Sequence, residues 1–161
     1  MKCGFIGLGI LGSKLCKNLL NAGVNLIVYD LDEKAILAAV ELGATSGGSV
    51  ADVCSGIDVL FTCLPSPAAS AQVMESDGGA LSALPLGATW IEISTTEVDE
   101  IKRLAAVANA KGINVLECPA TGGVHRAARG EMTLLVGGDE GVFETQRSLL
   151  EKMSGQIIFM G

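Results

Sequence analysis

Three glycines near the start of the chain restrict the possible fold more than any other feature of the sequence. Gly7, Gly9 and Gly12 form a Gly-x-Gly-x-x-Gly pattern between an apolar run at residues 3–6 and a stretch with leucines at helical spacing. In such a pattern the first glycine permits a tight turn, the second lets a phosphate reach the backbone, and the third lets a helix pack close to its strand. The N–H groups that begin the helix then face the anion. We therefore predict a strand, a phosphate-binding turn and a helix.

The residues that follow add an acid where a dinucleotide site needs one. Residues 25–29 are predicted to form a second strand, which ends at Asp30, 18 residues beyond Gly12. A carboxylate there accepts hydrogen bonds from the adenosine ribose hydroxyls and repels the extra phosphate of NADP, which favours NAD. In an alternative interpretation, the glycines serve only a tight turn and Asp30 caps a helix that starts near Asp32.

Strand and helix patterns alternate along the rest of the chain. Apolar residues make up 49% and charged residues 18% of the chain, which suits a sheet covered on both faces. The 161 residues are enough for one domain, residues 1–161. We predict an α/β fold with a doubly wound, Rossmann-type, mostly parallel sheet and helices on both faces. Further strands are expected at residues 44–45, 58–64, 89–93, 114–117, 133–136 and 156–160, and further helices at 32–42, 49–54, 68–74, 80–84, about 97–111, within 121–130 and at 139–153.

Charge and cysteine content exclude several classes of function. The net charge of −7 argues against nucleic-acid or anionic-membrane partners, and no apolar run approaches the roughly 20 residues of a membrane span. The five cysteines form no Cys-x-x-Cys pair, and the single histidine is not grouped with acids. We expect reduced thiols, a cytoplasmic or mitochondrial-matrix location and no metal site.

Loops at the carboxyl ends of the later strands are candidates for ligand contact, because ligands of open α/β sheets bind there. Leu64 and Pro65 follow the strongest buried strand and are predicted to cover part of a dinucleotide. Alternatively, the prolines Pro65 and Pro67 only end that strand and start a helix. The hydroxyls of Thr95 and Thr96 can contact a nicotinamide, cap the next helix, or do both.

A second glycine-rich loop follows the strand at residues 114–117. Thr121, Gly122 and Gly123 offer a hydroxyl and backbone N–H groups that can hold a carboxylate. His125 has no partner identifiable from the sequence, so we interpret it as an exposed polar residue rather than an acid or base. Arg126 and its neighbour Arg129 either pair with a substrate carboxylate or are solvated.

Five segments, in order, resemble those of the β-hydroxyacid dehydrogenase family, which includes 3-hydroxyisobutyrate dehydrogenase and 6-phosphogluconate dehydrogenase. The resemblance covers the whole chain. The chain is similar to the N-terminal, NAD-binding domain of these enzymes. Departures from the family pattern are Leu11 and Cys63 in place of Met, Thr121 in place of Ser, and Ala69 where some relatives have Asn. The matching segments are F-I-G-L-G-I-L-G at 5–12, F-T-C-L-P at 61–65, E-I-S-T at 92–95, E-C-P-A-T-G-G-V at 117–124 and G-E-M-T-L-L-V-G-G at 130–138.

The resemblance implies hydride transfer between NAD and a small 3-hydroxy acid or its semialdehyde. It implies substrate contacts from Thr121, Gly122 and Gly123. The family's catalytic lysine and helical C-terminal domain, which completes the substrate pocket and the homo-oligomer, would lie beyond Gly161, so we expect these 161 residues alone to be inactive. Implied cofactor contacts are Gly7, Leu8, Gly9, Ile10, Leu11, Gly12, Asp30, Leu64, Pro65 and Thr95.

Two other functions stay open at this point. One is an NADPH-dependent glyoxylate or succinic semialdehyde reductase, against which Asp30 argues. The other is a dehydrogenase-like module without catalysis that serves in binding or assembly. Intact cofactor and substrate loops favour the enzyme.

Overall fold

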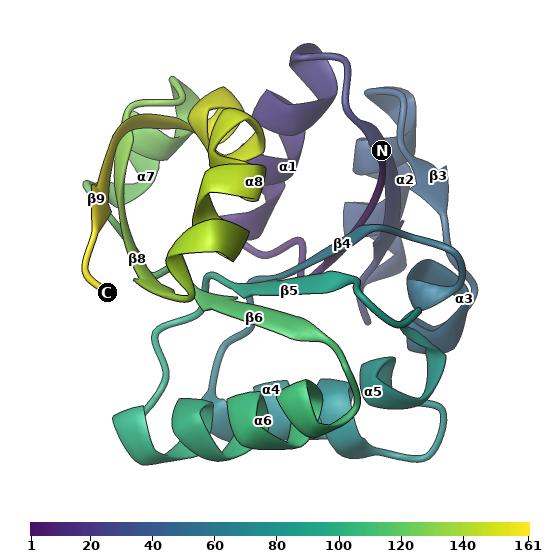
Figure 1. Cartoon of the computed structure of the whole chain (residues 1–161). Helices are drawn as coiled ribbons and strands as arrows, with labels where there is room; N and C mark the ends of the chain where they lie inside the picture. The colour runs from purple at the N-terminus through teal and green to yellow at the C-terminus, as the bar shows by residue number, and fades with distance from the viewer.

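The glycine pattern begins at the end of β1 (Lys2–Ile6), which lies inside a nine-stranded sheet in a computed structural model that describes residues 1–161 (Figure 1). The other strands are β2 (Asn25–Tyr29), β3 (Thr45–Ser46), β4 (Val59–Thr62), β5 (Thr89–Glu92), β6 (Asn114–Glu117), β7 (Ala120–Thr121), β8 (Met132–Gly138) and β9 (Ser154–Phe159). The helices are α1 (Gly12–Asn21), α2 (Glu33–Glu41), α3 (Val50–Cys54), α4 (Pro67–Glu75), α5 (Ala80–Ala83), α6 (Val98–Ala110), α7 (Gly123–Ala128), α8 (Glu140–Leu150) and the 3₁₀ helix η1 (Glu151–Met153).

The strand order reverses next to β1, and this reversal creates the place where a ligand can bind. β3, β2, β1, β4, β5 and β6 lie side by side in that order, and every neighbouring pair among them is parallel. The chain moves outward from β1 to β3 and then returns to place β4 on the other side of β1. The predicted doubly wound, mostly parallel fold is confirmed, and its switch point lies at the carboxyl ends of β1 and β4.

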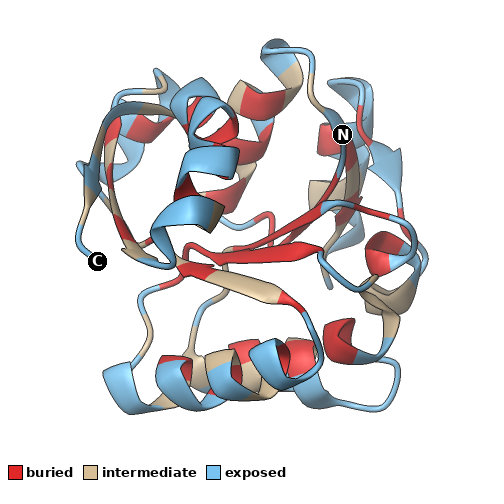
Figure 2. Cartoon of the chain, in the orientation of Figure 1, coloured by how far each residue is buried: buried red, intermediate tan, exposed pale blue.

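Helices cover both faces of the sheet because its central strands are apolar on both sides (Figure 2). Phe5, Phe61 and Ile91 lie in register on β1, β4 and β5 and belong to the core under α1 and α8. Leu60 and Trp90 point to the opposite face, which α3 to α6 cover. Because successive side chains of a strand point to opposite faces, the register also determines which face of the sheet each residue at a strand end occupies.

The last third of the chain departs from the parallel pattern. β8 runs antiparallel to β6 and to the two-residue β7, and β9 pairs with β8 in parallel. The sequence did not predict β7, because its two residues lie in the stretch that was interpreted as the second glycine-rich loop. The helix predicted at 139–153 ends at Leu150 and continues as the 3₁₀ turn η1.

One capping prediction was wrong. The N-cap residue of α6 is Glu97, and no side chain caps this helix. Thr95 and Thr96 precede the cap position and are therefore too far from the first free N–H groups to satisfy them. Thr96 Oγ1 is instead buried without a hydrogen-bond partner.

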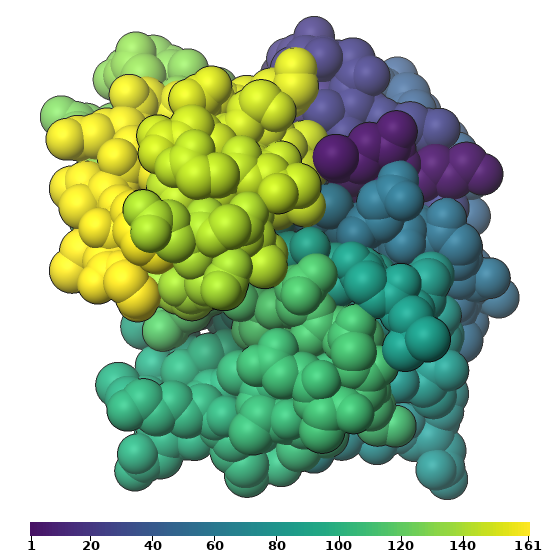
Figure 3. Space-filling view, in the orientation of Figure 1, coloured from purple at the N-terminus to yellow at the C-terminus, as the bar shows by residue number.

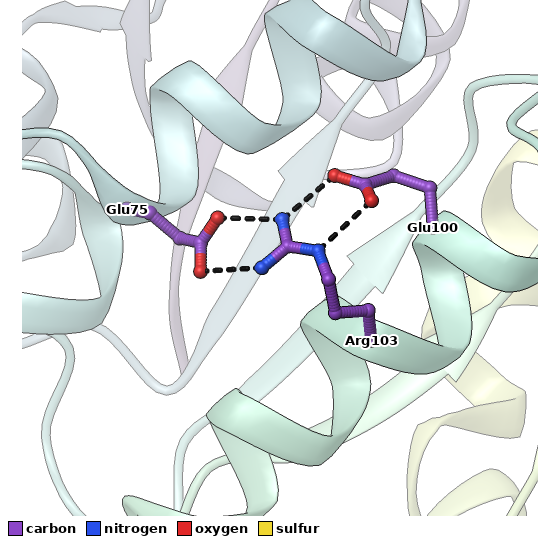
Figure 4. A network of polar contacts seen from close by, with 3 residues as sticks. All are labelled: Glu75, Glu100 and Arg103. Atoms are coloured by element: carbon purple, nitrogen blue, oxygen red, sulfur yellow. Dashed lines mark hydrogen bonds and ion pairs between the residues drawn. The ribbon is translucent and has the colours of Figure 1, made fainter.

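A surface ion-pair network joins α4 to α6 (Figure 4). The Arg103 guanidinium on α6 makes paired hydrogen bonds of 2.6–2.9 Å to the carboxylates of Glu75 on α4 and Glu100 on its own helix. These hydrogen bonds lower the pKa of both carboxyl groups. The pairs are solvent-exposed, and exposed pairs add little stability individually.

Candidate cofactor-binding site

A cleft of about 780 Å³ opens at the switch point of the sheet. It is formed by the turn between β1 and α1, the ends of β2, β4 and β5, and one side of α4. All the cofactor-binding residues predicted from the sequence line this cleft except Leu8. A cleft of this size with an apolar majority and a few polar groups is typical of a site for an organic ligand.

Leu8 has a different position from its neighbours in the glycine-rich turn. Its side chain is buried in the core under α1, and its backbone N–H donates a 2.6 Å hydrogen bond to Asp30 Oδ2. Neither group of Leu8 is free to contact a ligand in the cleft. Its contribution is to join the turn to the end of β2.

The start of α1 exposes a set of unpaired donors. The backbone N–H groups of Gly9, Ile10, Leu11 and Gly12 have no acceptor within the protein, and no side chain caps the helix. The first N–H groups of a ten-residue helix favour an anion through hydrogen bonding and through the helix dipole. This end of the cleft can therefore bind a phosphate group.

Each glycine of the turn meets a different steric requirement. Gly7 has a φ of 98°, and a Cβ built on it would lie 2.2 Å from the Cys63 carbonyl oxygen. A Cβ on Gly12 would lie 2.0 Å from the Gly7 carbonyl oxygen, so only glycine lets α1 start this close to the turn. A Cβ on Gly9 would meet no protein atom within 4 Å. Gly9 thus leaves open space beside the unpaired N–H groups.

The Asp30 carboxylate is held beside the turn by two backbone donors. One donor is the Leu8 N–H, which donates to Oδ2. The other is the Asp32 N–H, which donates to Oδ1 at 2.8 Å. The alternative role for Asp30, as the cap of α2, belongs to Asp32, whose side chain accepts from the Lys34 N–H. Asp30 lines the cleft, and each of its carboxylate oxygens has a further lone pair beyond the one that accepts from the backbone. It can accept hydrogen bonds from a ribose.

The far wall of the cleft contains residues that the sequence analysis partly missed. Leu64, Pro65 and Thr95 lie there as predicted, and the Leu64 N–H donates to Ser94 Oγ at 2.7 Å. The missed group is one face of α4, which could have been found from its i, i+3, i+4, i+7 spacing. Its members are Ala69, Gln72, Val73 and Ser76.

The predicted substrate-binding residues lie next to this cleft and not in it. Ala120 lines the cleft. The three residues that follow Ala120 in the chain are exposed and do not line the cleft: Thr121, Gly122 and Gly123. The two glycines have φ values of 131° and 80°, and the Gly123 N–H has no acceptor in the protein. Their backbone conformation can present N–H groups to a carboxylate.

The charged residues of α7 are on the surface. His125 and Arg126 are exposed, and Arg129 pairs with Glu131 at 2.9 Å. The helix is held to α1 by the Asn18 side chain, whose Nδ2 donates to the Ala127 carbonyl at 2.7 Å. The second glycine loop is thereby attached to the helix that carries the first.

The remaining polar groups give no sign of a second chemistry in the cleft. All five cysteines are free thiols, and burial raises the pKa of Cys63, which lines the cleft, to about 12. No group of three or more His, Cys, Asp and Glu side chains converges as a metal site. No helix has both the length and the apolar character needed to cross a membrane.

The family model of the NAD binding domain of 6-phosphogluconate dehydrogenase matches residues 2–161. The chain belongs to this family. The resemblance predicted from its five sequence segments is therefore confirmed, and NAD is the cofactor that the family's description names.

Several relatives of this NAD-binding domain are dehydrogenases by name. The chain is 35% identical to 2-(hydroxymethyl)glutarate dehydrogenase of Eubacterium barkeri, over 100% of its own length and 54% of the relative's. It is also 35% identical to NAD-dependent L-serine dehydrogenase of Pseudomonas aeruginosa, over 98% of its length and 53% of the relative's. The chain thus spans about half the length of these two relatives.

A solved structure with the same fold is 3-hydroxyisobutyrate dehydrogenase of Mycobacterium tuberculosis with L-serine. The TM-score is 0.94 at 30% identity, and the match covers 98% of this chain and 53% of that one. The NAD-binding domain described here therefore superimposes on the corresponding half of a hydroxyacid dehydrogenase.

Proposed function

We propose that this domain binds NAD across the switch-point cleft and is the cofactor half of an oxidoreductase that interconverts a small 3-hydroxy acid and its semialdehyde. The observation that carries the proposal is the pairing of two features. Unpaired N–H groups at residues 9–12 lie beside open space, and the Asp30 carboxylate is tied to the same turn at 2.6 Å. A dinucleotide needs an anion site and a ribose acceptor at this mutual position.

The cofactor is assigned to the cleft in three parts. Ile10, Leu11 and Gly12 bind the pyrophosphate through their N–H groups, and Asp30 accepts from the adenosine ribose. Leu64 and Pro65 cover the dinucleotide from the far wall, and Thr95 contacts the nicotinamide end. Bound NAD supplies the hydride chemistry, while the protein supplies binding and orientation.

The second glycine loop is assigned to the substrate. Thr121, Gly122 and Gly123 follow Ala120, which lines the cleft, so a carboxylate held by their hydroxyl and N–H groups lies next to the bound cofactor. Orientation of a bound hydroxy acid toward the cofactor lowers the barrier to transfer without further chemistry from these residues. His125 and Arg126, on the exposed side of α7, take no part in this assignment.

A second, helical domain is proposed to complete the enzyme. The chain spans about half the length of the relatives, and no lysine lies among the residues of the cleft. We propose that a lysine from that domain handles the hydroxyl proton and that the domain also forms a homo-oligomer. The five free thiols favour a reducing compartment, the cytoplasm or the mitochondrial matrix.

Calorimetric titration of the 161-residue chain with NAD and with NADP tests the cofactor assignment. We expect weak but measurable binding of NAD, weaker binding of NADP, and no turnover of 3-hydroxy acids. Equal affinity for the two cofactors would favour the NADPH-dependent reductase, and no affinity for either would reject the assignment. Sustained turnover by the 161 residues would show that the lysine of a second domain is not needed.

The coding sequence that follows the Gly161 codon tests the enzyme assignment. We expect a glycine-rich turn and a helix that carries a lysine. The same helix with another residue in place of the lysine, or a stop codon, would instead favour the binding or assembly module without catalysis.

A further inference from the structure

Glu92 is a fully buried acid that none of the roles described above uses. It is the last residue of β5 and the one Asp or Glu in the chain whose side chain is buried, at 0% exposure. Its Oε1 accepts a 2.9 Å hydrogen bond from the Ser94 N–H. Ser94 Oγ in turn accepts from the Leu64 N–H at 2.7 Å. This series of contacts connects the end of β5 to the loop after β4.

The other side of the Glu92 carboxyl faces α4 and β4. Hydroxyl groups of Ser70 and Thr62 lie against it, and Thr62 Oγ1 also accepts from Trp90 Nε1 at 2.7 Å. Ser70 Oγ and Glu92 Oε2 are both buried and satisfy no hydrogen bond of normal geometry. Ser70 stands on α4 one residue from Ala69, which lines the cleft.

These contacts place one carboxyl group between the three elements that form the far wall of the cleft. We propose that Glu92 is a positioning residue for NAD binding, which acts through Ser94 and Ser70 to fix the Leu64 loop and α4 at the spacing the dinucleotide requires. The inference rests on the proposed function, because it takes the cleft to be the NAD site.

The chemistry of a buried carboxyl fits this role. Burial is the main cause that raises the pKa of Glu92, and it favours the neutral form, which carries both a donor and an acceptor. A neutral carboxyl can accept from Ser94 N–H and donate to Ser70 Oγ at the same time. An apolar side chain would fill the space without the cost of burying a polar group, but it could not connect the loop after β4 to α4.

Three substitutions separate positioning from folding. Glu92→Leu removes every polar contact, and Ser70→Ala removes the contact to α4 alone. Glu92→Gln keeps an acceptor for Ser94 and gains a fixed donor for Ser70, and so should mimic the neutral acid. The matched control is Gln146→Leu, since Gln146 is also buried and polar and its Nε2 contacts Thr89 at the opposite end of the same strand.

The readout is the dissociation constant of NAD for each folded variant of the 161-residue chain, with its melting temperature. We expect Glu92→Leu to weaken NAD binding about tenfold, because the 2.9 Å hydrogen bond from the Ser94 N–H is lost. Ser70→Ala should weaken NAD binding by a smaller factor, because the Ser70 hydroxyl lies against the carboxyl group without a hydrogen bond of normal geometry. Glu92→Gln should keep the NAD affinity within about twofold of that of the unchanged chain. If Glu92 acted only through a negative charge, this neutral variant would instead lose affinity. Gln146→Leu should change the melting temperature and leave the affinity unaltered.

Several results would overturn the inference. Unaltered affinity in Ser70→Ala or in folded Glu92→Leu would show that the contacts do not position the wall, and equal weakening in Gln146→Leu would indicate general loosening of the fold. If Glu92→Leu does not fold, Ser70→Ala and Glu92→Gln decide the matter. NAD binding by the unchanged chain separates this inference from the proposed function, since its absence would reject both.

Discussion

The backbone N–H of Leu8 donates to Asp30 Oδ2 at 2.6 Å, so the glycine-rich turn and the acid at the end of β2 form one unit. A residue expected to select the cofactor is at the same time a structural part of the glycine-rich turn. Substitutions of Asp30 therefore affect two properties that the experiment has to separate.

Replacement of Asp30 by alanine should relax the preference for NAD over NADP. The carboxylate that repels the extra phosphate is lost, so we expect the dissociation constant of NADP divided by that of NAD to fall about tenfold. NAD binding itself should weaken, because the Leu8 N–H loses its acceptor. Isothermal titration with both cofactors measures each effect. Asp32→Ser removes a charge two residues away and keeps the cap of α2, so it should leave the ratio unaltered. An unchanged ratio in Asp30→Ala would count against the assignment.

The two glycines Gly9 and Gly12 should respond differently to alanine. A Cβ on Gly9 points into open space, so Gly9→Ala should keep its melting temperature and lose NAD affinity through contact with the pyrophosphate. A Cβ on Gly12 would lie 2.0 Å from the Gly7 carbonyl, so Gly12→Ala should lower the melting temperature as well. Thermal unfolding and NAD titration of both variants check the contrast. Unaltered NAD binding by Gly9→Ala would mean that the pyrophosphate lies elsewhere.

Asn18 should stabilise the second glycine loop, because its Nδ2 donates to the Ala127 carbonyl at 2.7 Å. Asn18→Asp places a carboxylate against that carbonyl and should cost about 1–3 kcal/mol of stability. Hydrogen exchange of α7 should accelerate. Asn109→Asp is the control, since Asn109 is exposed and also lies in the last turn of its helix, where a negative charge is equally unfavourable. If both variants lose the same amount of stability, the effect comes from the helix dipole and not from the contact with the Ala127 carbonyl.

The five cysteines should make the fold sensitive to high pH. Burial raises the pKa to about 11 in Cys3 and to about 12 in the other four, from 9.0. Above pH 9 the unfolded chain loses thiol protons that the folded chain keeps, so the stability present below pH 9 is progressively lost up to about pH 12. Each thiol contributes about 1.4 kcal/mol per pH unit between pH 9 and its own pKa in the folded chain, about 11 for Cys3 and about 12 for the other four.

Denaturant titrations at several pH values measure this loss. Cys54→Ala should reduce the slope of stability against pH by the share of one thiol, and the comparison cancels the ionisation of other groups. A slope unaffected by the substitution would show that Cys54 ionises as readily in the folded as in the unfolded chain.

Local signals in the sequence were sufficient to predict the central half of the fold. Gly7, Gly9, Gly12 and Asp30 predicted the first crossover and the cleft-lining turn, because these residues lie within one strand–helix–strand unit. The alternation of strand patterns with helix patterns along the chain predicted the mostly parallel sheet. Leu64, Pro65 and Thr95 were predicted from their place after the buried strands and from the family resemblance, and they line the cleft because parallel strands carry their ends to one edge of the sheet.

Only the tertiary structure decided which residues from distant segments meet. Three features depend on contacts between segments that are distant in the sequence. They are the antiparallel pairing of β8 with β6, the position of Thr121 outside the cleft, and the hydrogen bond from the Leu8 N–H to Asp30. The capping of α6 by Thr95 or Thr96 failed because the helix begins after Glu97. The position of Glu92 between β4, β5 and α4 also follows from packing, since burial and hydrogen-bond partners are properties of the assembled fold and not of the local sequence.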